Sequence, residues 1–370
     1  MKFERVLTDS PIREIHNRLS LLSSFGGAYR LIQKQAPSLY SRKLILKKSE
    51  GLAFTAKTAL EFLRNQNYVS ETARSLNQYY ALLNLMSSIL IANSDNELTL
   101  FEIENIFKKG HGLMNLYKMD AQANEEIEDP FENELLAFLP DGFITRYLSQ
   151  HGYSLKNICS SRRYECWQKI PQNEINRFFS IKEIVSRIPE LKNIYTEIFH
   201  DQPNYLHITT QRHGDELIDL VIDRNHNTVH LTEENILDIL ELTEHDLHKN
   251  LTFRKNKSDG DQFVLENLNP KDVEYINGNI HYSIMANNIY IKPLVGISDY
   301  LIYPVLFLYC ISIWVRYRPA LWREIHEGNY DFLLPLVQGF MDVVDRVVTN
   351  EVLNRIYGRR ILFAPPAYFS

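Results

Sequence analysis

Apolar residues recur at spacings of three and four over much of the first third of the chain, which is the period of an amphipathic helix. The clearest stretch covers residues 73–91, where helix breakers are few. Ser70 precedes it as an N-cap, and a shorter apolar stretch over residues 98–108 stops at Gly110. Residues from about 10 to 118 are therefore predicted to be helical.

Beyond residue 121 the pattern changes to short apolar stretches separated by turn residues, which indicates strands. An acidic run at residues 125–129 predicts an exposed linker, and Pro-Asp-Gly at residues 140–142 predicts the turn of a β-hairpin. The predicted strands are residues 135–139, 143–148, 206–210, 217–222, 228–231 and a β segment near 280–291. The other predicted elements are helices over 181–188 and from Thr232, and an exposed loop over 250–262.

The longest apolar run, residues 301–315, is too short to span a membrane and contains Pro304 and Ser312, so we expect a buried core helix. A helix that is apolar nearly all round needs partners on every side. The chain is predicted to stay helical to about residue 357. The predicted fold is α+β and mostly α, a helical bundle of N- and C-terminal helices with a smaller β-containing middle. Its three regions are residues 1–120, 121–262 and 263–370.

Composition narrows the class of protein. The chain has 370 residues, of which 45% are hydrophobic and 12% aromatic, as in ordinary folded proteins. Its net charge of −6 argues against a protein that coats nucleic acid nonspecifically, although a local basic groove is compatible with it. Cys159, Cys166 and Cys310 lack a CxxC spacing and indicate reduced thiols, and the charged N-terminal stretch does not fit a signal peptide. We expect a soluble cytoplasmic protein without membrane segment, metal or cofactor.

Five polar residues form the first candidate ligand site: Arg74, Tyr79, Tyr80, Asn84 and His111. An arginine is a permanent cation, tyrosines offer hydroxyls and stacking faces, and an asparagine both donates and accepts hydrogen bonds. Tyr80 and Asn84 are four residues apart and share a helix face, and His111 between two glycines can lie on a tight turn. These groups suit an anion, a nucleotide or a nucleic-acid end. The alternative is that they tie the helix to a neighbour through buried hydrogen bonds.

Two further sets of residues carry charged or metal-ligating side chains. Arg316 and Arg318 follow the apolar run and are the second candidate for an anion site, unless they complement the end of that helix. Histidines and aspartates gather within residues 207–230 without the spacing of a metal motif, so we interpret them as the solvated face of a sheet. No P-loop, GxGxxG, GxSxG or HExxH motif is present.

Three stretches resemble the YaaC-like family of bacterial proteins: residues 73–85 (ARSLNQYYALLNL) with 111–113, residues 180–195, and residues 316–322. The resemblance implies an α-rich bacterial protein without an assigned reaction, whose tyrosine-bearing helix is similar to HEPN-type bundles. HEPN ribonucleases carry an Arg and a His a few residues apart on a helix, and the matching stretches lack such a pair. Arg146 and His151 have that spacing elsewhere, but on the strand predicted there they point to opposite faces.

The sequence therefore predicts an accessory or effector protein. Its expected partner is another protein, a second copy of the chain, or an anionic ligand such as a nucleotide or nucleic acid. A HEPN-type ribonuclease that needs no metal and a structural subunit of a larger complex are the alternatives, and whether the chain is an enzyme stays open. A solvent-open arrangement of Arg74, Asn84 and His111 favours ligand binding, whereas mutual burial favours a scaffold.

Overall fold

The chain divides into two compact units. Unit 1 comprises Met1–Ile181 and Pro304–Ser370, and unit 2 comprises Lys182–Tyr303. The structure is a computed structural model, and it describes residues 2–364 except for 65–68, 119–128, 214–216, 224–230, 243–250, 255–261, 269–275, 277–279 and 282–287.

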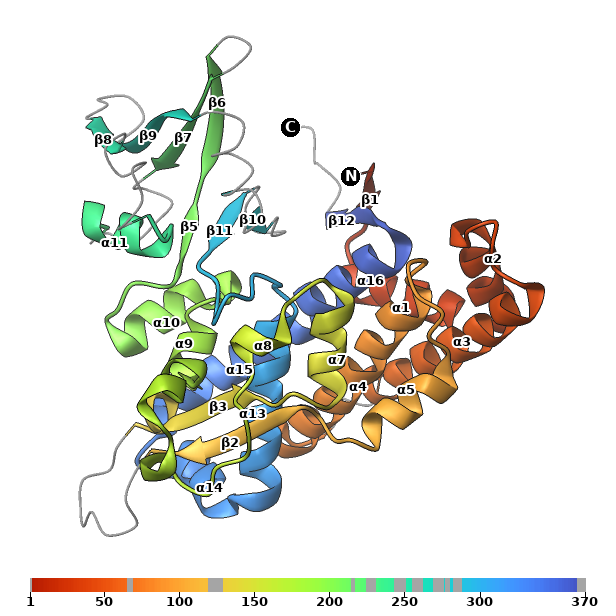
Figure 1. Cartoon of the computed structure of the whole chain (residues 1–370), viewed down its shortest axis with the longest axis horizontal. Helices are drawn as coiled ribbons and strands as arrows, with labels where there is room; N and C mark the ends of the chain where they lie inside the picture. Colours follow the sequence, from red (N-terminus) through yellow and green to blue (C-terminus); the bar gives the residue numbers. More distant parts are fainter. Residues whose placement is uncertain are drawn as a thin grey trace. The chain divides into compact units, whose positions relative to one another are not determined.

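Unit 1 is a bundle in which helices from the two ends of the chain pack together (Figure 1). α4 (Glu71–Ala92) contacts α3 (Arg42–Arg64), α15 (Leu334–Val343) and α16 (Thr349–Tyr357). The hydroxyl of Ser70 caps α4 as predicted. The other helices of unit 1 are α1 (Pro11–Leu22), α2 (Phe25–Gln35), α5 (Leu100–Phe107), α6 (Pro130–Asn133), α7 (Phe143–Gln150), α8 (Leu155–Ile158) and α14 (Pro319–Glu327). The predicted bundle is confirmed, and the fold is α+β and mostly α.

α13 (Ile302–Tyr317) is the helix that the long apolar run predicts. Its residues from Pro304 onward belong to unit 1, and almost all of them up to Trp314 are buried. The chain also remains helical up to Tyr357, where α16 ends, as predicted. Among the described residues, no helix is both long and apolar enough to cross a membrane.

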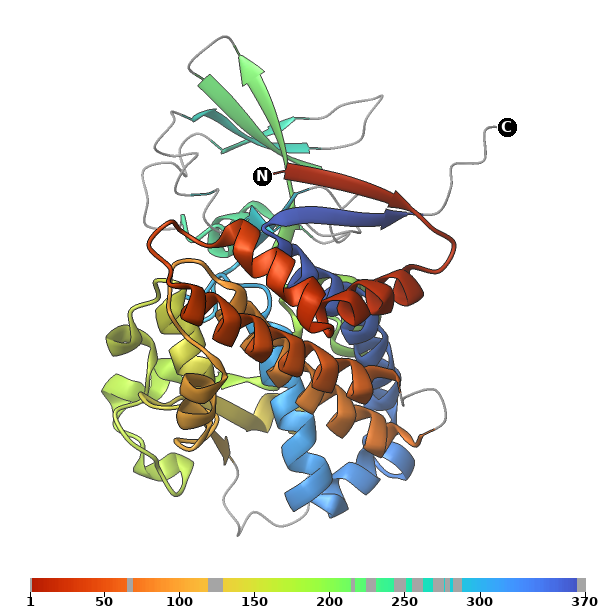
Figure 2. The same ribbon diagram turned by 90° about the vertical axis from the view of Figure 1, so that its right-hand side faces the viewer.

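Two small sheets complete unit 1. β1 (Lys2–Leu7) and β12 (Arg359–Ala364) run in parallel beside each other (Figure 2). β2 (Leu113–Tyr117), β3 (Glu134–Phe138) and β4 (Phe179–Ser180) form an antiparallel sheet in the order β2-β3-β4. The first and last elements of the chain therefore join one another, as its first and last helices do.

Two predictions for this region are wrong. Residues 143–148 are not the second strand of a hairpin but part of α7, because Phe143, Ile144, Tyr147 and Leu148 recur with the helical period and all four are buried. β3 pairs with β2 and β4 instead. β2 in turn occupies the end of the stretch that was predicted to be wholly helical, since its five residues are too few to show a clear strand period. Residues 125–128 of the predicted acidic linker lie outside the described part of the chain.

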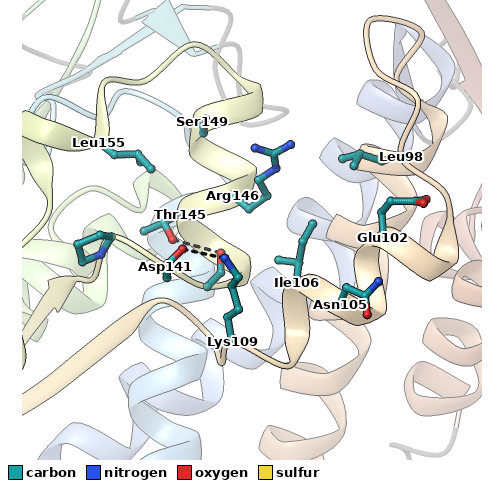
Figure 3. Close-up of a pocket in the computed structure, with 12 residues that line it drawn as sticks. Leu98, Glu102, Asn105, Ile106, Lys109, Asp141, Thr145, Arg146, Ser149 and Leu155 are labelled. Carbon is teal, nitrogen blue, oxygen red and sulfur yellow. Dashed lines mark hydrogen bonds and ion pairs between the residues drawn. The ribbon is translucent and has the colours of Figure 1, made fainter.

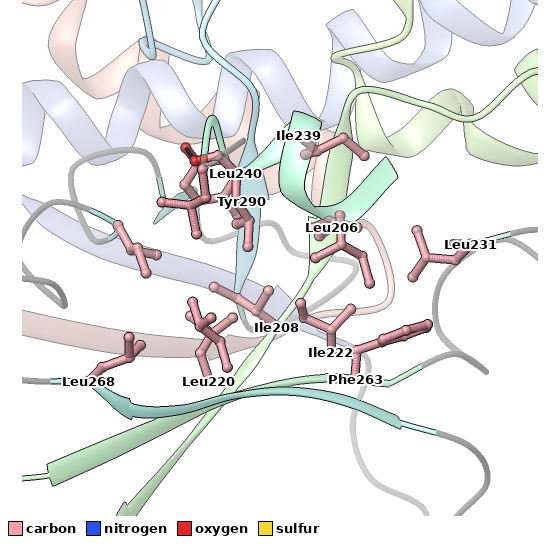
Figure 4. Packing of buried hydrophobic residues seen from close by; sticks show 14 residues of the cluster. Leu206, Ile208, Leu220, Ile222, Leu231, Ile239, Leu240, Phe263, Leu268 and Tyr290 are labelled. Carbon is pink, nitrogen blue, oxygen red and sulfur yellow. Dashed lines mark hydrogen bonds between the residues drawn. The ribbon is translucent and has the colours of Figure 1, made fainter. Parts of the chain in front are cut away.

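Unit 2 contains the larger sheet, antiparallel in the order β6-β7-β9-β8. The strands of this sheet are β6 (Thr209–His213), β7 (Leu217–Asp223), β8 (Leu251–Arg254) and β9 (Gln262–Leu268). A second sheet of unit 2 has the order β10-β11-β5, with strands β5 (Tyr205–His207), β10 (Ile280–His281) and β11 (Ile289–Ile291). The helices of unit 2 are α9 (Ile181–Val185), α10 (Lys192–Phe199) and α11 (Glu233–Ile239). The first residue of α9, Ile181, is the last residue of the first segment of unit 1. Figure 4 shows its core, in which side chains of β5, β7 and β9 meet those of α11.

The sequence predictions for unit 2 are mostly confirmed. Strands occur near residues 206–210, 217–222 and 280–291, and Thr232 starts α11 with a capping box. The predicted loop over 250–262 is wrong at its ends, where β8 and the first residue of β9 lie, and residues 255–261 are outside the described part. Residues 228–230 of the strand predicted over 228–231 also lie outside the described part of the chain.

A buried lysine fixes the connection after α4. The side chain of Lys48 on α3 is 1% exposed. Its Nζ donates to the carbonyl oxygens of Asn93 at 2.9 Å and Asn96 at 2.6 Å. Burial lowers the pKa of Lys48 to about 8. The ammonium group therefore loses its proton in an accessible pH range, which makes its contribution to stability measurable.

Between about pH 8 and pH 9.5 the stability of unit 1 is expected to rise in the wild type relative to Lys48→Met. The pKa of folded Lys48 lies below its ordinary value of 10.5, so at this residue the unfolded chain binds more protons than the folded one in this window. The free energy of unfolding of the wild type minus that of the variant then rises by up to about 1.4 kcal/mol per pH unit. Tryptophan fluorescence during denaturant unfolding reports unit 1 alone, because Trp167, Trp314 and Trp322 all belong to it. Equal pH slopes in the two proteins contradict the prediction.

Candidate functional site

Four candidate residues from distant parts of the sequence meet in unit 1, together with one that was not selected. The ring of Tyr79 on α4 lies 5.6 Å from that of Tyr80, 5.7 Å from that of His111 and 6.2 Å from that of Tyr309 on α13, measured between centroids. His111 and Tyr309 are 6.0 Å apart. Arg316 follows Tyr309 by seven residues, which places both on one face of α13, and its charge acts on Tyr79, His111 and Tyr309. We call these five residues the tyrosine–arginine cluster.

A glycine turn between α5 and β2 places His111. Gly110 and Gly112 have φ angles of +91° and +80°, a backbone region that residues with a Cβ rarely adopt. The carbonyls of the same turn hold the start of α7, since the Phe143 N–H donates to Gly110 at 3.0 Å and the Ile144 N–H donates to His111 at 2.9 Å. The backbone at His111 is thus fixed to α7, and its side chain is free to face the tyrosines.

Tyr79 and Tyr309 are the buried members of the cluster, and burial sets their charge state. Tyr79 is 1% exposed, and burial raises the pKa of its hydroxyl far above the usual value. Burial likewise raises the pKa of Tyr309. Burial, and then the positive charge of Arg316, lower the pKa of His111 below 6.5. At neutral pH the neutral hydroxyls of Tyr79 and Tyr309 and the neutral imidazole of His111 therefore lie beside one permanent cation, Arg316.

Within the described part of the chain, Arg316 has no acidic partner, and three other polar atoms of the cluster have no hydrogen-bond partner. The guanidinium of Arg316 donates to the carbonyl of Ser312 at 2.9 Å and to its hydroxyl at 3.0 Å, and makes no ion pair with a described residue. The hydroxyls of Tyr79 and Tyr309 make no hydrogen bond within the described part of the chain, and neither does the buried Nδ1 of His111. Buried polar atoms in folded proteins normally have partners. These atoms are the ones that an oxygen-rich ligand would satisfy.

Among the described residues, the charged side chains that shift the pKa values of Tyr79, His111 and Tyr309 are positive. Arg316 acts on the pKa of Tyr79, His111 and Tyr309, and exposed Arg163 also acts on that of Tyr309. Arg163, too, makes no ion pair with a described residue. No carboxylate is among the groups that shift these three pKa values within the described residues. The local charge therefore differs in sign from the net charge of the chain.

A family model described as YaaC-like Protein matches residues 28–356. The chain belongs to the YaaC-like family. This confirms the resemblance seen in the sequence, and the match includes every residue of the tyrosine–arginine cluster. Comparisons with curated proteins and with solved structures each gave no match. The similarity of this YaaC-like protein to HEPN bundles, and any activity, therefore stay predictions.

Arg74 of the YaaC-like chain lies in a different network from His111. Its guanidinium bonds the carboxylates of Asp342 at 2.6 Å and Asp345 at 2.8 Å. Gln78 donates to Asp345 as well, at 2.8 Å. Burial raises the pKa of Asp345 despite these bonds. The network ties α4 to the helices of the C-terminal segment, so the geometry gives Arg74 a structural role.

Arg318 is likewise engaged by a carboxylate. It forms an ion pair with Glu134 of β3, which is fully buried, and its guanidinium lies 4.5 Å from the ring centroid of Tyr117. Asn115 of β2 also donates to Glu134. Of the two arginines after the apolar run, Arg316 is the one left without an ion pair among the described residues.

Three other candidate residues have local roles. The amide of Asn84 donates to the carbonyl of Tyr80 at 2.8 Å, within the same helix. Arg146 and His151 lie on or next to α7 rather than on a strand, but a five-residue offset still separates their directions by about 140°. His151 stacks on Tyr147 at 4.1 Å and bonds its carbonyl through Nδ1 at 2.8 Å. The geometry therefore does not make a catalytic pair of Arg146 and His151.

Sequence reasoning missed Tyr309 and Arg163. Tyr309 stands inside an apolar run, where a tyrosine is an ordinary core residue, and the seven-residue offset to Arg316 is the signal that connects it to the site. The histidine and aspartate group predicted as a solvated sheet face lies mostly outside the described side chains. Within the described residues, no group of three or more His, Cys, Asp or Glu could hold a metal ion.

Proposed function

We propose that this YaaC-like protein binds a nucleotide, or the terminal nucleotide of a single-stranded nucleic acid, at the tyrosine–arginine cluster. One observation carries the proposal: the rings of Tyr79, His111 and Tyr309 lie 5.7–6.2 Å apart, and Arg316, on the Tyr309 face of α13, makes no ion pair with a described residue. A phosphate offers acceptors to the guanidinium and to both hydroxyls. It also brings the negative charge that these groups attract.

Aromatic rings at the edge of the cluster favour a ligand with a base over inorganic phosphate. Tyr80 is 37% exposed and Tyr317 is 68% exposed. The guanidinium of Arg316 lies 5.0 Å from the ring centroid of Tyr317 and supports it as a platform. Stacking of a base on such a ring contributes about 1–3 kcal/mol in single-stranded nucleic-acid complexes. A phosphate at Arg316 and a base on Tyr317 together describe a nucleotide.

The charge of the whole chain restricts the form of the ligand. A net charge of −6 disfavours the many phosphate contacts of a long duplex. Two arginines near one aromatic cluster suit one or two phosphates. A mononucleotide and a short single strand share this chemistry, and they are separated by the binding experiment.

Removing single groups of the cluster is expected to weaken binding while leaving the fold intact. Arg316→Gln should lower the affinity for a nucleotide by about tenfold to a hundredfold, because a charged hydrogen bond is lost. Tyr79→Phe and Tyr309→Phe should each lower it by about threefold to tenfold. These hydroxyls bond no described residue, so the melting temperature should stay within about 1–2 °C. Calorimetry with AMP and with inorganic phosphate, and fluorescence polarisation with short single-stranded RNA and DNA, measure the affinities.

Arg323→Gln is the matched control. Arg323 of α14 is 73% exposed and pairs with neighbouring Glu324. The substitution is expected to leave every affinity unchanged. Equal binding by Arg316→Gln and the wild type contradicts the proposal. So does a Tyr→Phe loss of affinity that is matched by a loss of stability, because the hydroxyls then serve the fold.

A further inference from the structure

A pocket lies beside α7, the helix whose first amides bond the carbonyls of the His111 turn. The pocket between α5 and α7 has a volume of about 420 Å³, which is at the small end of the range for ligand sites. Figure 3 shows Arg146 directed from α7 toward α5, and Glu102 on the facing helix. All of its lining residues belong to unit 1, and none belongs to the tyrosine–arginine cluster.

The charges of the lining are balanced, and most of them are already engaged. Lys109 pairs with Asp141 at 3.2 Å. Glu102 accepts the N–H of Thr99 at 2.8 Å and so completes the cap of α5. Arg146 is exposed and makes no ion pair with a described residue. A single cation is thus available to a ligand, opposite two acidic groups.

Two amides at the start of α7 are already engaged. The N–H groups of Phe143 and Ile144 donate to the carbonyls of Gly110 and His111. Arg146 is therefore the main group of the lining that can bind an anion, since Lys109 is paired with Asp141. The planar guanidinium matches a carboxylate with two parallel hydrogen bonds. A doubly charged phosphate would meet the same arginine and also the repulsion of Glu102 and Asp141.

The rest of the lining is apolar or neutral. Leu98, Ile106 and Leu155 form an apolar part, and Ser149 contributes a hydroxyl that bonds no described residue. Such a lining suits the apolar body of a ligand with few polar groups. We infer that the pocket between α5 and α7 binds a small monocarboxylate with an apolar body, whose carboxylate bonds Arg146. This site is independent of the proposed nucleotide site.

The test uses the full chain and three probes of similar shape: 3-phenylpropanoate, 3-phenylpropan-1-ol and phenyl phosphate. Ligand-observed NMR and calorimetry are expected to show that the carboxylate binds more tightly than the alcohol and the phosphate. Arg146→Gln should weaken binding of 3-phenylpropanoate about tenfold or more, because the bidentate contact is lost. Arg162→Gln, an exposed arginine outside the pocket, is the control and should change nothing.

A second variant tests the selection against dianions. Glu102→Gln keeps a side chain that can cap α5 but removes the negative charge, so the affinity for phenyl phosphate should rise relative to that for 3-phenylpropanoate. An unchanged ratio would show that Glu102 sets no selectivity and would overturn that part of the inference. Failure of 3-phenylpropanoate to bind the wild type, or equal binding by Arg146→Gln, overturns the site itself.

Discussion

Arg318→Met is expected to destabilise unit 1 by about 3–5 kcal/mol, because it leaves a buried carboxylate without its counter-ion. Glu134 is fully buried, and burial already raises its pKa, while Arg318 and Asn115 act to lower it. Methionine keeps the aliphatic part of the side chain but not the guanidinium that lies over Tyr117. Denaturant unfolding followed by tryptophan fluorescence measures the loss in unit 1.

Removing the other charge of the ion pair should lower the stability of unit 1 by less. Glu134→Gln removes the charge but keeps an acceptor for Arg318, whose side chain is 31% exposed and can reach water. We expect a loss of about 1–2 kcal/mol. The exposed pair of Arg323 and Glu324 provides a control, since Arg323→Met should leave the stability unchanged. Equal losses in Arg318→Met and Glu134→Gln contradict the assignment of the buried charge to Glu134.

The penalty in Arg318→Met should shrink in acid. Without Arg318 the pKa of folded Glu134 rises further above its ordinary value of 4.5. The folded variant then holds a proton that the unfolded chain has lost, so its stability falls as the pH rises through this window. Near pH 4.5 the carboxyl group is neutral in the folded variant, and the gap between variant and wild type should be at its smallest. A gap that does not change with pH contradicts this explanation.

The sequence predicted the bundle because its signal is local. The helical period over α4 and the apolar run of α13 each indicate a buried helix, and both helices occur. The strand predicted over residues 143–148 is part of α7, and the spacing of Phe143, Ile144, Tyr147 and Leu148 carries the helical signal. The Pro-Asp-Gly sequence is typical of a hairpin turn and predicts one here, but in the structure Gly142 directly precedes α7.

The candidate site could be predicted only in part because its partners are far apart in the chain. Tyr79, His111 and Arg316 were each selected for their chemistry, but only the fold brings them together. Arg74 has the same chemistry as Arg316, and its engagement depends on Asp342 and Asp345 of the C-terminal helices. A single sequence does not show which arginine meets a distant carboxylate. The structure therefore shows a difference that the sequence does not: Arg74 has carboxylate partners, and Arg316 has none among the described residues.

The backbone contact between the His111 turn and Gly142 is expected to be the most sensitive point of unit 1. Gly142 has a φ angle of +137° and precedes α7. A Cβ at this position would lie 2.1 Å from the N of Gly112 and 2.4 Å from its Cα. Backbone atoms cannot move aside as a flexible side chain can. Gly142→Ala should therefore destabilise unit 1 by about 3–6 kcal/mol, combining overpacking with a backbone conformation that is nearly specific to glycine.

Gly152→Ala separates the two causes. Gly152 also has a left-handed φ angle, +85°, but a Cβ there meets no atom within 4 Å, so only backbone strain of about 1–2 kcal/mol is expected. Gly142→Ala should further displace the turn that the Ile144 N–H fixes at 2.9 Å, and should weaken nucleotide binding because His111 moves with it. Unfolding followed by tryptophan fluorescence and calorimetry with AMP measure the two effects. A loss of stability no greater than that of Gly152→Ala would mean that the turn can separate from α7, and that His111 is not held by this contact.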